Sequence, residues 1–433
     1  MIARVLDVLA PRVSGADLVV KTDDTLTVAI SSDGDSRATS SRSRSSHLRV
    51  AREGRVGYAS TEGDDAGELI GHALASASSG GEIELFLPAP APLPEVASRT
   101  PQAAVADVAA LDGLARGLLE RLQRSDRRIE VWGERAAGSV QVANTRGVLA
   151  AYEVTLAGVG AVVESIGAGS APPCRVHTAA SALPGLPDIE RLVSEVERRL
   201  LPPLLDACPP LPATLPVCLA PRAVATFLRP LRAALAGYEA WLGSSPLRGR
   251  LGERVFDEKF SLIDDPLAPG RPGSRPIDDD GVISRRLSLV ERGRLLAFLA
   301  DLEVGARAQV PSTGHSWRNP AAAPRVGFTN LCLSPGIEGR ATLLTMMGRG
   351  LLIEDLAWNG GPNPLAGSFT CRAPWAYLVE GGVVQGRLDG VVLSGNVFAA
   401  LAELGAIGND STWVGALCVP TLLVEGLGTA VRR

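Results

Sequence analysis

The stretch TLPVCLAPRAVATFLRPLRAAL, residues 214–235, sets the architecture of the second half of the chain. Its first part is apolar and predicts a strand over residues 214–219. Apolar residues then recur with helical spacing, which predicts a helix over about residues 223–235. From there to Val424, short apolar runs alternate with glycines, a pattern typical of strands joined by tight turns. We therefore predict a β-rich C-terminal domain over residues 210–433.

The first segment upstream, residues 1–90, is predicted to be an α+β domain. A short helix precedes two strands around the turn residues Asp23 and Asp24, and the Ser/Arg-rich stretch that follows is expected to be a mobile loop. A hairpin signal and a stretch of helical periodicity complete the segment. The predicted bounds are 17–21 and 25–30 for the strands, 39–46 for the loop, 48–60 for the hairpin with its turn at 53–55, and 65–78 for the helix.

Pro-rich stretches at residues 87–101 and 202–216 enclose the middle segment, residues 91–209. Two helices and several strands are predicted in it, with helices at 107–123 and 188–200 and strands at 129–132, 139–144 and 148–163. Together the three segments predict an α+β fold: N-terminal mixed α/β segments, with sheets and flanking helices, followed by a large, mostly antiparallel β-rich C-terminal domain.

Composition narrows the classes of partner. The 433 residues carry a formal net charge of -4, so the positive field that nucleic-acid binding needs is missing, and we expect no nucleic-acid partner. Charged Arg4 and Asp7 interrupt the N-terminal apolar run, and about 18 apolar residues never follow one another without proline or charge. We therefore expect a soluble, cytoplasmic protein without membrane contact. The scattered cysteines are expected to be reduced and mostly buried.

Familiar catalytic motifs are missing from the chain. None of the 4 histidines (His47, His72, His177 and His315) lies within four residues of another, so no helix presents two imidazoles to one zinc ion. There is no G-x-S-x-G sequence, and neither lysine follows a glycine-rich phosphate loop.

Three features leave alternatives open. The acidic clusters 264–265 and 278–280 adjoin Pro and Gly, which favours turn chemistry, with a cation site as the alternative. His315 lies in a polar loop with Gly314, where it is either catalytic or, more simply, an exposed or hydrogen-bonding loop histidine. Cys371 and Cys418 are candidate nucleophiles only if the fold supplies a base.

An ordered set of short stretches in this chain resembles the TldD/PmbA (TldE) family of zinc-metalloprotease-related proteins. No single stretch is decisive, but together they follow the family's order over most of the chain. The hairpin at residues 49–60 with its following helix is also similar to the family's N-terminal domain. The remaining stretches are GSSPL (243–247), LGE (251–253), IDDP (263–266), PRVGFTNL (324–331) with SPG (334–336), GRGLLI (348–353), NPLAGSF (363–369), GN (395–396) and AIGND (406–410).

This chain departs from the catalytic members at their zinc motif. The resemblance implies that in those members a strand leads into a helix bearing His-Glu-x-x-x-His, whose histidines hold zinc while the Glu polarises a water and a distant Cys completes the site. Here Arg229 and Ala234 occupy the places of the two histidines, and Pro230 occupies the place of the Glu. An Arg does not ligate zinc at neutral pH, and Pro and Ala offer no donor atom. We expect no catalytic residue, metal or cofactor in this chain.

The C-terminal run WVGALCVPTLLVEG, residues 413–426, looks like the ending of the PmbA/TldE branch, and Cys418 is expected to be a core thiol in a strand. The resemblance implies a metal-free subunit that pairs with a zinc-bearing TldD-like chain and encloses unfolded or leader peptides for cleavage. The alternatives are a stand-alone homodimeric peptide-binding or scaffold protein, and a hydrolase with a non-zinc site around His315, Cys371 or Asp410. The candidate peptide-binding residues are Arg325, Asn330 and Asn359, chosen because each is a polar residue near Gly or Pro in β-rich sequence.

Overall fold

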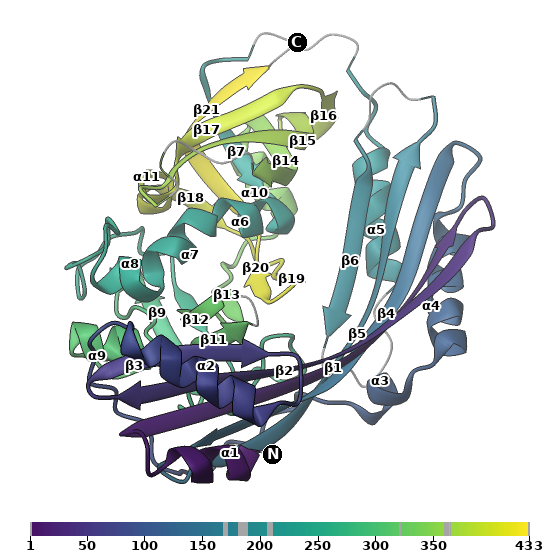
Figure 1. The fold of residues 1–433 in the computed structure, drawn as a ribbon. Helices are drawn as coiled ribbons and strands as arrows, with labels where there is room; N and C mark the ends of the chain where they lie inside the picture. The colour runs from purple at the N-terminus through teal and green to yellow at the C-terminus, as the bar shows by residue number, and fades with distance from the viewer. Residues whose placement is uncertain are drawn as a thin grey trace.

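The computed structural model describes residues 2–167, 172–180, 189–205, 211–319, 322–358, 363 and 365–431. Within these residues the fold is α+β, as predicted, and the region after residue 210 is rich in mostly antiparallel strands. Figure 1 shows the long N-terminal strands along one side of the molecule, with the C-terminal half packed beside them.

The described N-terminal strands form one antiparallel six-stranded sheet in the order β3-β2-β1-β4-β5-β6. Strands from the predicted segments 1–90 and 91–209 therefore lie in the same sheet, and the first Pro-rich stretch connects two parts of it. The strands are β1 (Gly15–Ser31), β2 (Ser36–Arg52), β3 (Arg55–Thr61), β4 (Arg127–Asn144), β5 (Leu149–Ser165) and β6 (Cys174–Ala180).

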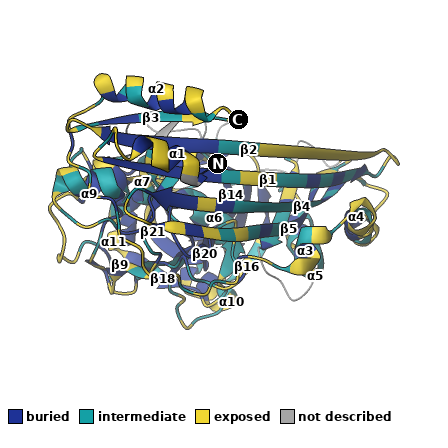
Figure 2. Cartoon of the chain, turned by 60° about the horizontal axis from the view of Figure 1, so that its bottom comes forward, coloured by how far each residue is buried: buried dark blue, intermediate teal, exposed yellow. Residues whose placement is uncertain are grey.

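Three of these strands are longer than the sequence predicts. β1 continues through Asp23 and Asp24, where a turn is expected, because it pairs with β2 on one side and β4 on the other at these positions. The expected mobile loop at residues 39–46 is instead part of β2, although its side chains are largely exposed (Figure 2). The expected strands 129–132 and 139–144 are likewise parts of the single strand β4. Pairing on the sheet outweighs the local preference of Ser, Asp and Gly for turns.

Helices cover this sheet, and all but α3, which was not predicted, lie close to the predicted positions. They are α1 (Ile2–Leu9), α2 (Ala66–Ser78), α3 (Pro101–Val105), α4 (Val108–Leu122) and α5 (Ile189–Leu200). Asp65 caps α2 by accepting from the backbone N–H groups of Gly67 and Glu68, and Asp107 caps α4. α2 packs on β2 and β3, whereas α4 packs on β1 and β4. None of the described helices is long and apolar enough to cross a membrane.

A seven-stranded sheet lies at the centre of the C-terminal half. Its order is β14-β7-β21-β17-β15-β16 with β18 on β21, and an extra pairing of β14 with β15 closes five of the strands into a ring. The strands are β7 (Thr214–Leu219), β14 (Arg349–Trp358), β15 (Ser368–Glu380), β16 (Val383–Leu388), β17 (Val391–Asn396), β18 (Leu404–Ile407) and β21 (Leu422–Val431).

A second sheet of six described strands packs beside this ring, in the order β10-β9-β8-β13-β20-β19. Its strands are β8 (Leu262–Asp264), β9 (Leu287–Glu291), β10 (Arg294–Leu295), β13 (Leu331–Leu333), β19 (Thr412–Val414) and β20 (Leu417–Val419). The hairpin β11 (Ser316–Asn319) and β12 (Ala322–Val326) stands apart from both sheets. The helices are α6 (Pro221–Phe227), α7 (Arg229–Leu235), α8 (Gly237–Trp241), α9 (Leu302–Ala308), α10 (Arg340–Met347) and α11 (Val397–Ala402).

Candidate functional site

The helix predicted over residues 223–235 is two short helices, α6 and α7, that meet at Leu228. α6 begins earlier than predicted, at Pro221, whose fixed φ suits the first turn of a helix. Pro230 has no N–H to donate to the carbonyl four residues back, which explains the interruption at Leu228. The broken helix follows directly after β7 and packs on β14, β19 and β20.

The three positions that correspond to the family's zinc motif do not face a common space. Arg229 is exposed, and its guanidinium lies 5.6 Å from the centroid of the Trp358 ring. Pro230 and Ala234 are buried, and Ala234 belongs to the apolar core of the C-terminal half. Arg232, three residues after Arg229, is half-buried and its guanidinium lies over the Phe328 ring. Burial lowers the pKa of Arg232, and the positive charge of Arg229 lowers it further.

His315, the most suggestive histidine of the sequence, is fully buried rather than exposed. Its Nε2 lies 2.9 Å from Asp264 Oδ2 and its Nδ1 lies 2.9 Å from Thr313 Oγ1. Asp264 also accepts from the backbone N–H of Thr329 at 3.0 Å, and the Thr313 hydroxyl donates to the Ala300 carbonyl at 3.0 Å. The Thr–His–Asp arrangement has the connectivity of a catalytic triad, but its hydrogen bonds fasten three loops together inside the core. We interpret it as structural.

The candidate peptide-binding residues have different surroundings. Arg325 lies on β12 opposite Trp317 and is exposed. Asn330 is fully buried, and its amide donates to Asp265 O at 2.8 Å and to Ser274 Oγ at 3.0 Å, so it holds the loop that follows β8. Asn359 lies outside the described residues. Of the two described members of the set, Arg325 is therefore the exposed one.

A buried ionic cluster joins the N-terminal sheet to the C-terminal half. Arg49 Nη2 on β2 lies 2.6 Å from Asp17 Oδ2 on β1 and 3.1 Å from Asp280 Oδ1. Arg318 on β11 lies 2.9 Å from the same Asp280 oxygen. Burial alone would raise the pKa of Asp280, but Arg49 and Arg318 outweigh it and hold the pKa at about 2. Sequence reasoning missed this cluster, because its members come from β1, β2, the 278–280 turn and β11, which are far apart in the sequence.

The acidic stretches combine turn chemistry with ion pairing. Asp278 accepts from the backbone N–H groups of Asp280 and Val282, as the turn interpretation predicts. Asp279, in contrast, pairs with Lys21 on β1 at 2.5 Å and accepts from the Arg318 N–H at 2.7 Å. The turn interpretation was therefore incomplete: the triplet also anchors the N-terminal sheet.

A second ionic cluster attaches α5 to the C-terminal half. The buried carboxylate of Glu354 on β14 pairs with Arg198 on α5 at 3.1 Å and with Arg340 on α10. Although burial raises the pKa of Glu354, these arginines outweigh it and lower the pKa to about 2. Nearby, Arg222 on α6 lies 3.8 Å from Glu195 on α5. α6 therefore lies where the N-terminal unit and both C-terminal sheets meet.

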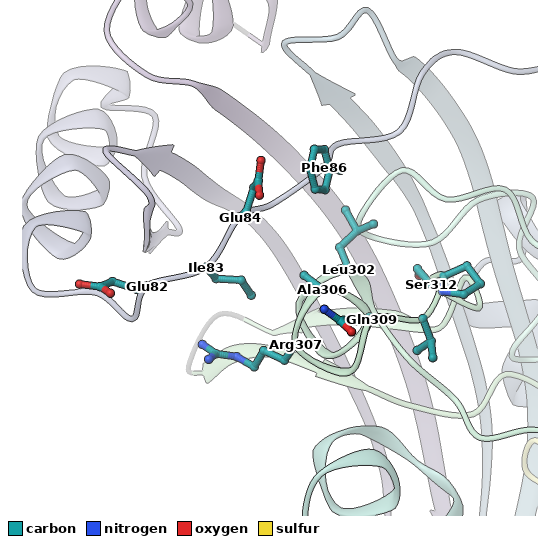
Figure 3. A pocket seen from close by; sticks show the side chains of 12 residues that line it. Glu82, Ile83, Glu84, Phe86, Leu302, Ala306, Arg307, Gln309 and Ser312 are labelled. Atoms are coloured by element: carbon teal, nitrogen blue, oxygen red, sulfur yellow. The ribbon is translucent and has the colours of Figure 1, made fainter.

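Among other places, the described surface is hollowed at two that adjoin the N-terminal sheet or the segment after it. One, of about 570 Å³, lies between residues 82–86 and α9, where Phe86 is 67% exposed (Figure 3). The other, of about 270 Å³, lies between the N-terminal sheet and the segment around Arg275, whose guanidinium is 4.1 Å from the Trp317 ring centroid. Neither is lined by a residue of α6 or α7.

Comparison with known proteins identifies the family. Residues 212–431, which make up half of the chain, match the PmbA/TldA metallopeptidase C-terminal domain. The chain belongs to this family. The family resemblance noted in the sequence is thereby confirmed.

Curated relatives and a solved structure agree with this assignment. The chain is 30% identical over 179 residues to the metalloprotease PmbA homolog of Haemophilus influenzae, a match that covers 41% of this chain and 37% of that protein. It is 26% identical over 237 residues to the zinc metalloprotease TldD homolog of Saccharolobus solfataricus, covering 53% and 52% of the two chains. Crystallised TldE from Thermococcus kodakarensis superposes with a TM-score of 0.87 over 99% of both chains at 21% identity, which shows a shared fold.

The residues at the family's zinc position do not fit the metal. Zinc in proteins takes thiolate, imidazole or carboxylate donors, and Arg229, Pro230 and Ala234 supply none. Within the described residues, no three His, Cys, Asp or Glu side chains are grouped so that they could hold a metal ion. We therefore derive no step through zinc in this chain.

Among the described cysteines, which do not include Cys208, the two on β13 and β20 differ from expectation. Cys174, Cys218 and Cys371 are buried, as expected. Cys418, expected to be a lone core thiol, is half-buried and lies directly opposite Cys332 on the neighbouring strand. The prediction went wrong because the sequence gives no sign that β13 and β20, more than eighty residues apart, are neighbours.

Proposed function

We propose that this chain is the non-catalytic subunit of a two-chain, TldD/TldE-like metallopeptidase. Its partner would be a TldD-like chain that carries His-Glu-x-x-x-His and binds zinc, and the two would enclose an unfolded or leader peptide. The observation that carries the proposal is the side-chain chemistry of the α6–α7 pair: an exposed, Trp-stacked Arg229, then buried Pro230 and Ala234, in a fold shared with TldE.

A non-catalytic subunit contributes by capture and enclosure. An extended peptide adds to an exposed strand edge through backbone hydrogen bonds. Such binding requires an extended peptide conformation and depends little on the peptide's side chains. The β11–β12 hairpin, a separate two-stranded element of the described structure, presents such a strand with the exposed Arg325 on it. We propose Arg325 as a contact to peptide carboxylates, with Asn359 as a second polar contact.

Reconstitution with a zinc-bearing partner tests the proposal. The purified chain is mixed with a TldD-like chain from the same genome, and cleavage of a fluorescently labelled, unstructured polypeptide is followed with and without chelator. We expect a stoichiometric complex whose chelator-sensitive cleavage exceeds that of either chain alone by at least roughly tenfold. Elemental analysis is expected to give about one zinc per complex and none in this chain alone.

Two outcomes would contradict the proposal. A monodisperse homodimer that binds the polypeptide but ignores every zinc-bearing family member would favour the stand-alone binding protein. Chelator-insensitive cleavage by the isolated chain, lost in a His315→Ala variant that circular dichroism shows to be folded, would favour the hydrolase. An Arg325→Ala variant, with the exposed Arg52→Ala as the matched control, then distinguishes the peptide contact from a general loss of positive charge.

A further inference from the structure

The thiols of Cys332 and Cys418 face each other across two neighbouring strands. Cys332 is the central residue of β13 and Cys418 the central residue of β20, and the parallel register places them directly opposite one another. Neighbouring strands lie roughly 4.8 Å apart. That separation is within the range of about 4.4–6.8 Å between Cα atoms that a disulfide spans.

Alternation along the strands turns both thiols away from the core. Leu331 and Leu333 on β13, like Leu417 and Val419 on β20, belong to the apolar core of the C-terminal half. The cysteines between them point to the opposite face and are half-buried. They continue a row across the sheet that runs from Ile263 on β8 to Trp413 on β19, so the pair lies on the accessible face.

The surroundings of the pair favour a thiolate on one member. The pKa of Cys418 is lowered to about 7, against the opposing effect of burial, first by hydrogen bonding with the Cys332 thiol and then by the Arg271 guanidinium. The same hydrogen bonding raises the pKa of Cys332, as do burial and the carboxylates of Asp265 and Asp264. The Cys332 sulfur also lies 3.7 Å from the Asn330 carbonyl oxygen. Arg271 is stacked 4.3 Å from the ring centroid of Trp413, the strand partner of Cys418. Cys418 therefore has the character of an attacking thiol and Cys332 that of a resolving thiol.

We propose that Cys332 and Cys418 are a redox-active pair that closes to an intramolecular disulfide when hydrogen peroxide oxidises Cys418. The proposal concerns a modification site and is independent of any peptidase partner. Closure would tie β13 to β20 beneath α6, which packs on β20.

The chemistry balances with peroxide as the oxidant. The Cys418 thiolate attacks one peroxide oxygen, the O–O bond breaks and hydroxide leaves, so Cys418 becomes a sulfenic acid. Cys332 gives its proton to this hydroxide, and its sulfur attacks the Cys418 sulfur, forming the S–S bond and expelling the sulfenic oxygen as a second hydroxide. That hydroxide takes up the proton that Cys418 released to solvent on forming the thiolate. Overall, two thiols and one peroxide give one disulfide and two waters.

The other described cysteines provide an internal comparison. Burial raises the pKa of Cys174 to about 11 and that of Cys218 to about 12, and Cys371 is 1% exposed. Buried thiols held in the protonated form react slowly with peroxide. Oxidation is therefore expected at the 332–418 pair before these three positions.

Peroxide oxidation of the full chain tests the proposal. The protein is treated with a small excess of hydrogen peroxide at pH 7, remaining thiols are alkylated, and a non-reducing digest is analysed by mass spectrometry. We expect a peptide pair joined through Cys332 and Cys418, lost on reduction, in a monomer whose mass has fallen by two hydrogens.

Reciprocal serine variants separate the two roles. In Cys332→Ser the resolving thiol is absent but a hydroxyl donor remains, so dimedone should trap a sulfenic acid at Cys418. Cys418→Ser should trap at least roughly tenfold less at Cys332, because that thiol stays protonated. Circular dichroism of both variants checks that they are folded.

The proposal is overturned if Cys332 and Cys418 of the wild-type chain are both recovered in alkylated form, and so were still reduced after peroxide treatment, while another cysteine is oxidised. It is equally overturned if the disulfide forms between two chains, or if the two serine variants give the same yield of sulfenic acid. A folded Cys332→Ala variant adds a second measurement: without a donor to Cys418, its sulfenic acid should form several-fold more slowly than in Cys332→Ser.

Discussion

At the scale of single residues, burial decides between structural and catalytic interpretations of the same atoms. His315 has two hydrogen-bond partners at 2.9 Å in an arrangement that would suit catalysis, yet no part of it is exposed. Substrate has no path to the imidazole, and the carboxylate beside it is committed to the backbone N–H of Thr329. A polar group of this kind is retained because removing it leaves other buried groups without partners.

Replacing His315 with alanine is expected to reduce stability rather than remove an activity. The change leaves Asp264 Oδ2 and Thr313 Oγ1 without the imidazole and opens a cavity, at a cost of roughly 2–4 kcal/mol in the free energy of unfolding. Urea denaturation measures the loss. His72→Ala is the matched control, since His72 is exposed on α2 and should cost less than about 0.5 kcal/mol. Equal stabilities for the two variants would refute the structural interpretation.

For the candidate site, the sequence predicts only those properties that depend on residue type alone, such as whether a side chain has an atom that can bind zinc. Arg229, Pro230 and Ala234 lack zinc donors whatever their conformation. Accessibility, in contrast, depends on tertiary packing: nothing in the sequence around Asn330 indicates that its amide is fully buried and holds a loop. Pairs such as Cys332 and Cys418 depend on strand order, which local sequence does not encode.

At the scale of elements, the helices were predicted more accurately than the long strands. The capping residues Asp65 and Asp107 and the apolar periodicity that follows each define α2 and α4 locally. β1 and β2, in contrast, keep Asp and Ser in strand conformation because partners on the sheet bind their backbone. The α6–α7 break also has a local cause, Pro230, although the sequence analysis predicted one continuous helix there.

Restoring the family's motif on this helix pair is not expected to restore a metal site. In the triple variant Arg229→His, Pro230→Glu, Ala234→His, the last histidine replaces a fully buried alanine and overpacks the core, at a cost of roughly 1–3 kcal/mol. We expect a lower melting temperature and well under one zinc per chain by elemental analysis after dialysis. The single variant Arg229→His is the control for surface binding of zinc. Stoichiometric zinc in the triple variant without loss of stability would show that the backbone is already arranged for the metal.

At the scale of the whole molecule, charged residues from distant parts of the sequence hold the two halves together. Asp17 and Arg49 of the N-terminal sheet meet Asp280 and Arg318 at one contact, and α5 meets Glu354 at the other. Apolar residues are shared as well, because Trp375 and Tyr377 of β15 lie in the same core cluster as α4 and α5. The N-terminal unit is thus packed against the C-terminal half by both buried charge and apolar contact.

Breaking the first cluster should therefore destabilise the whole chain. Arg49→Met removes the charge that compensates Asp17 and Asp280, both of which are buried, and we expect a loss of roughly 3–5 kcal/mol. Thermal unfolding followed by circular dichroism measures it. Arg52→Met, three residues along β2 and exposed, is the control and should change the melting temperature little. Equal melting temperatures would show that the cluster contributes no net stability.

The second cluster gives the chain a defined acid sensitivity. Glu354 has a pKa of about 2 when folded, against about 4.3 for a free Glu, so the native state binds fewer protons than the unfolded state between these values. The stability it contributes is complete above about pH 5 and is lost as pH falls from about 4 to 2, an effect on the order of 3 kcal/mol. Glu354→Gln should lower stability at pH 7 and flatten this part of the pH profile in urea titrations. Glu380→Gln, which alters an exposed pair with Arg349, should keep the wild-type profile, and an unchanged slope in Glu354→Gln would assign the acid sensitivity to other carboxylates.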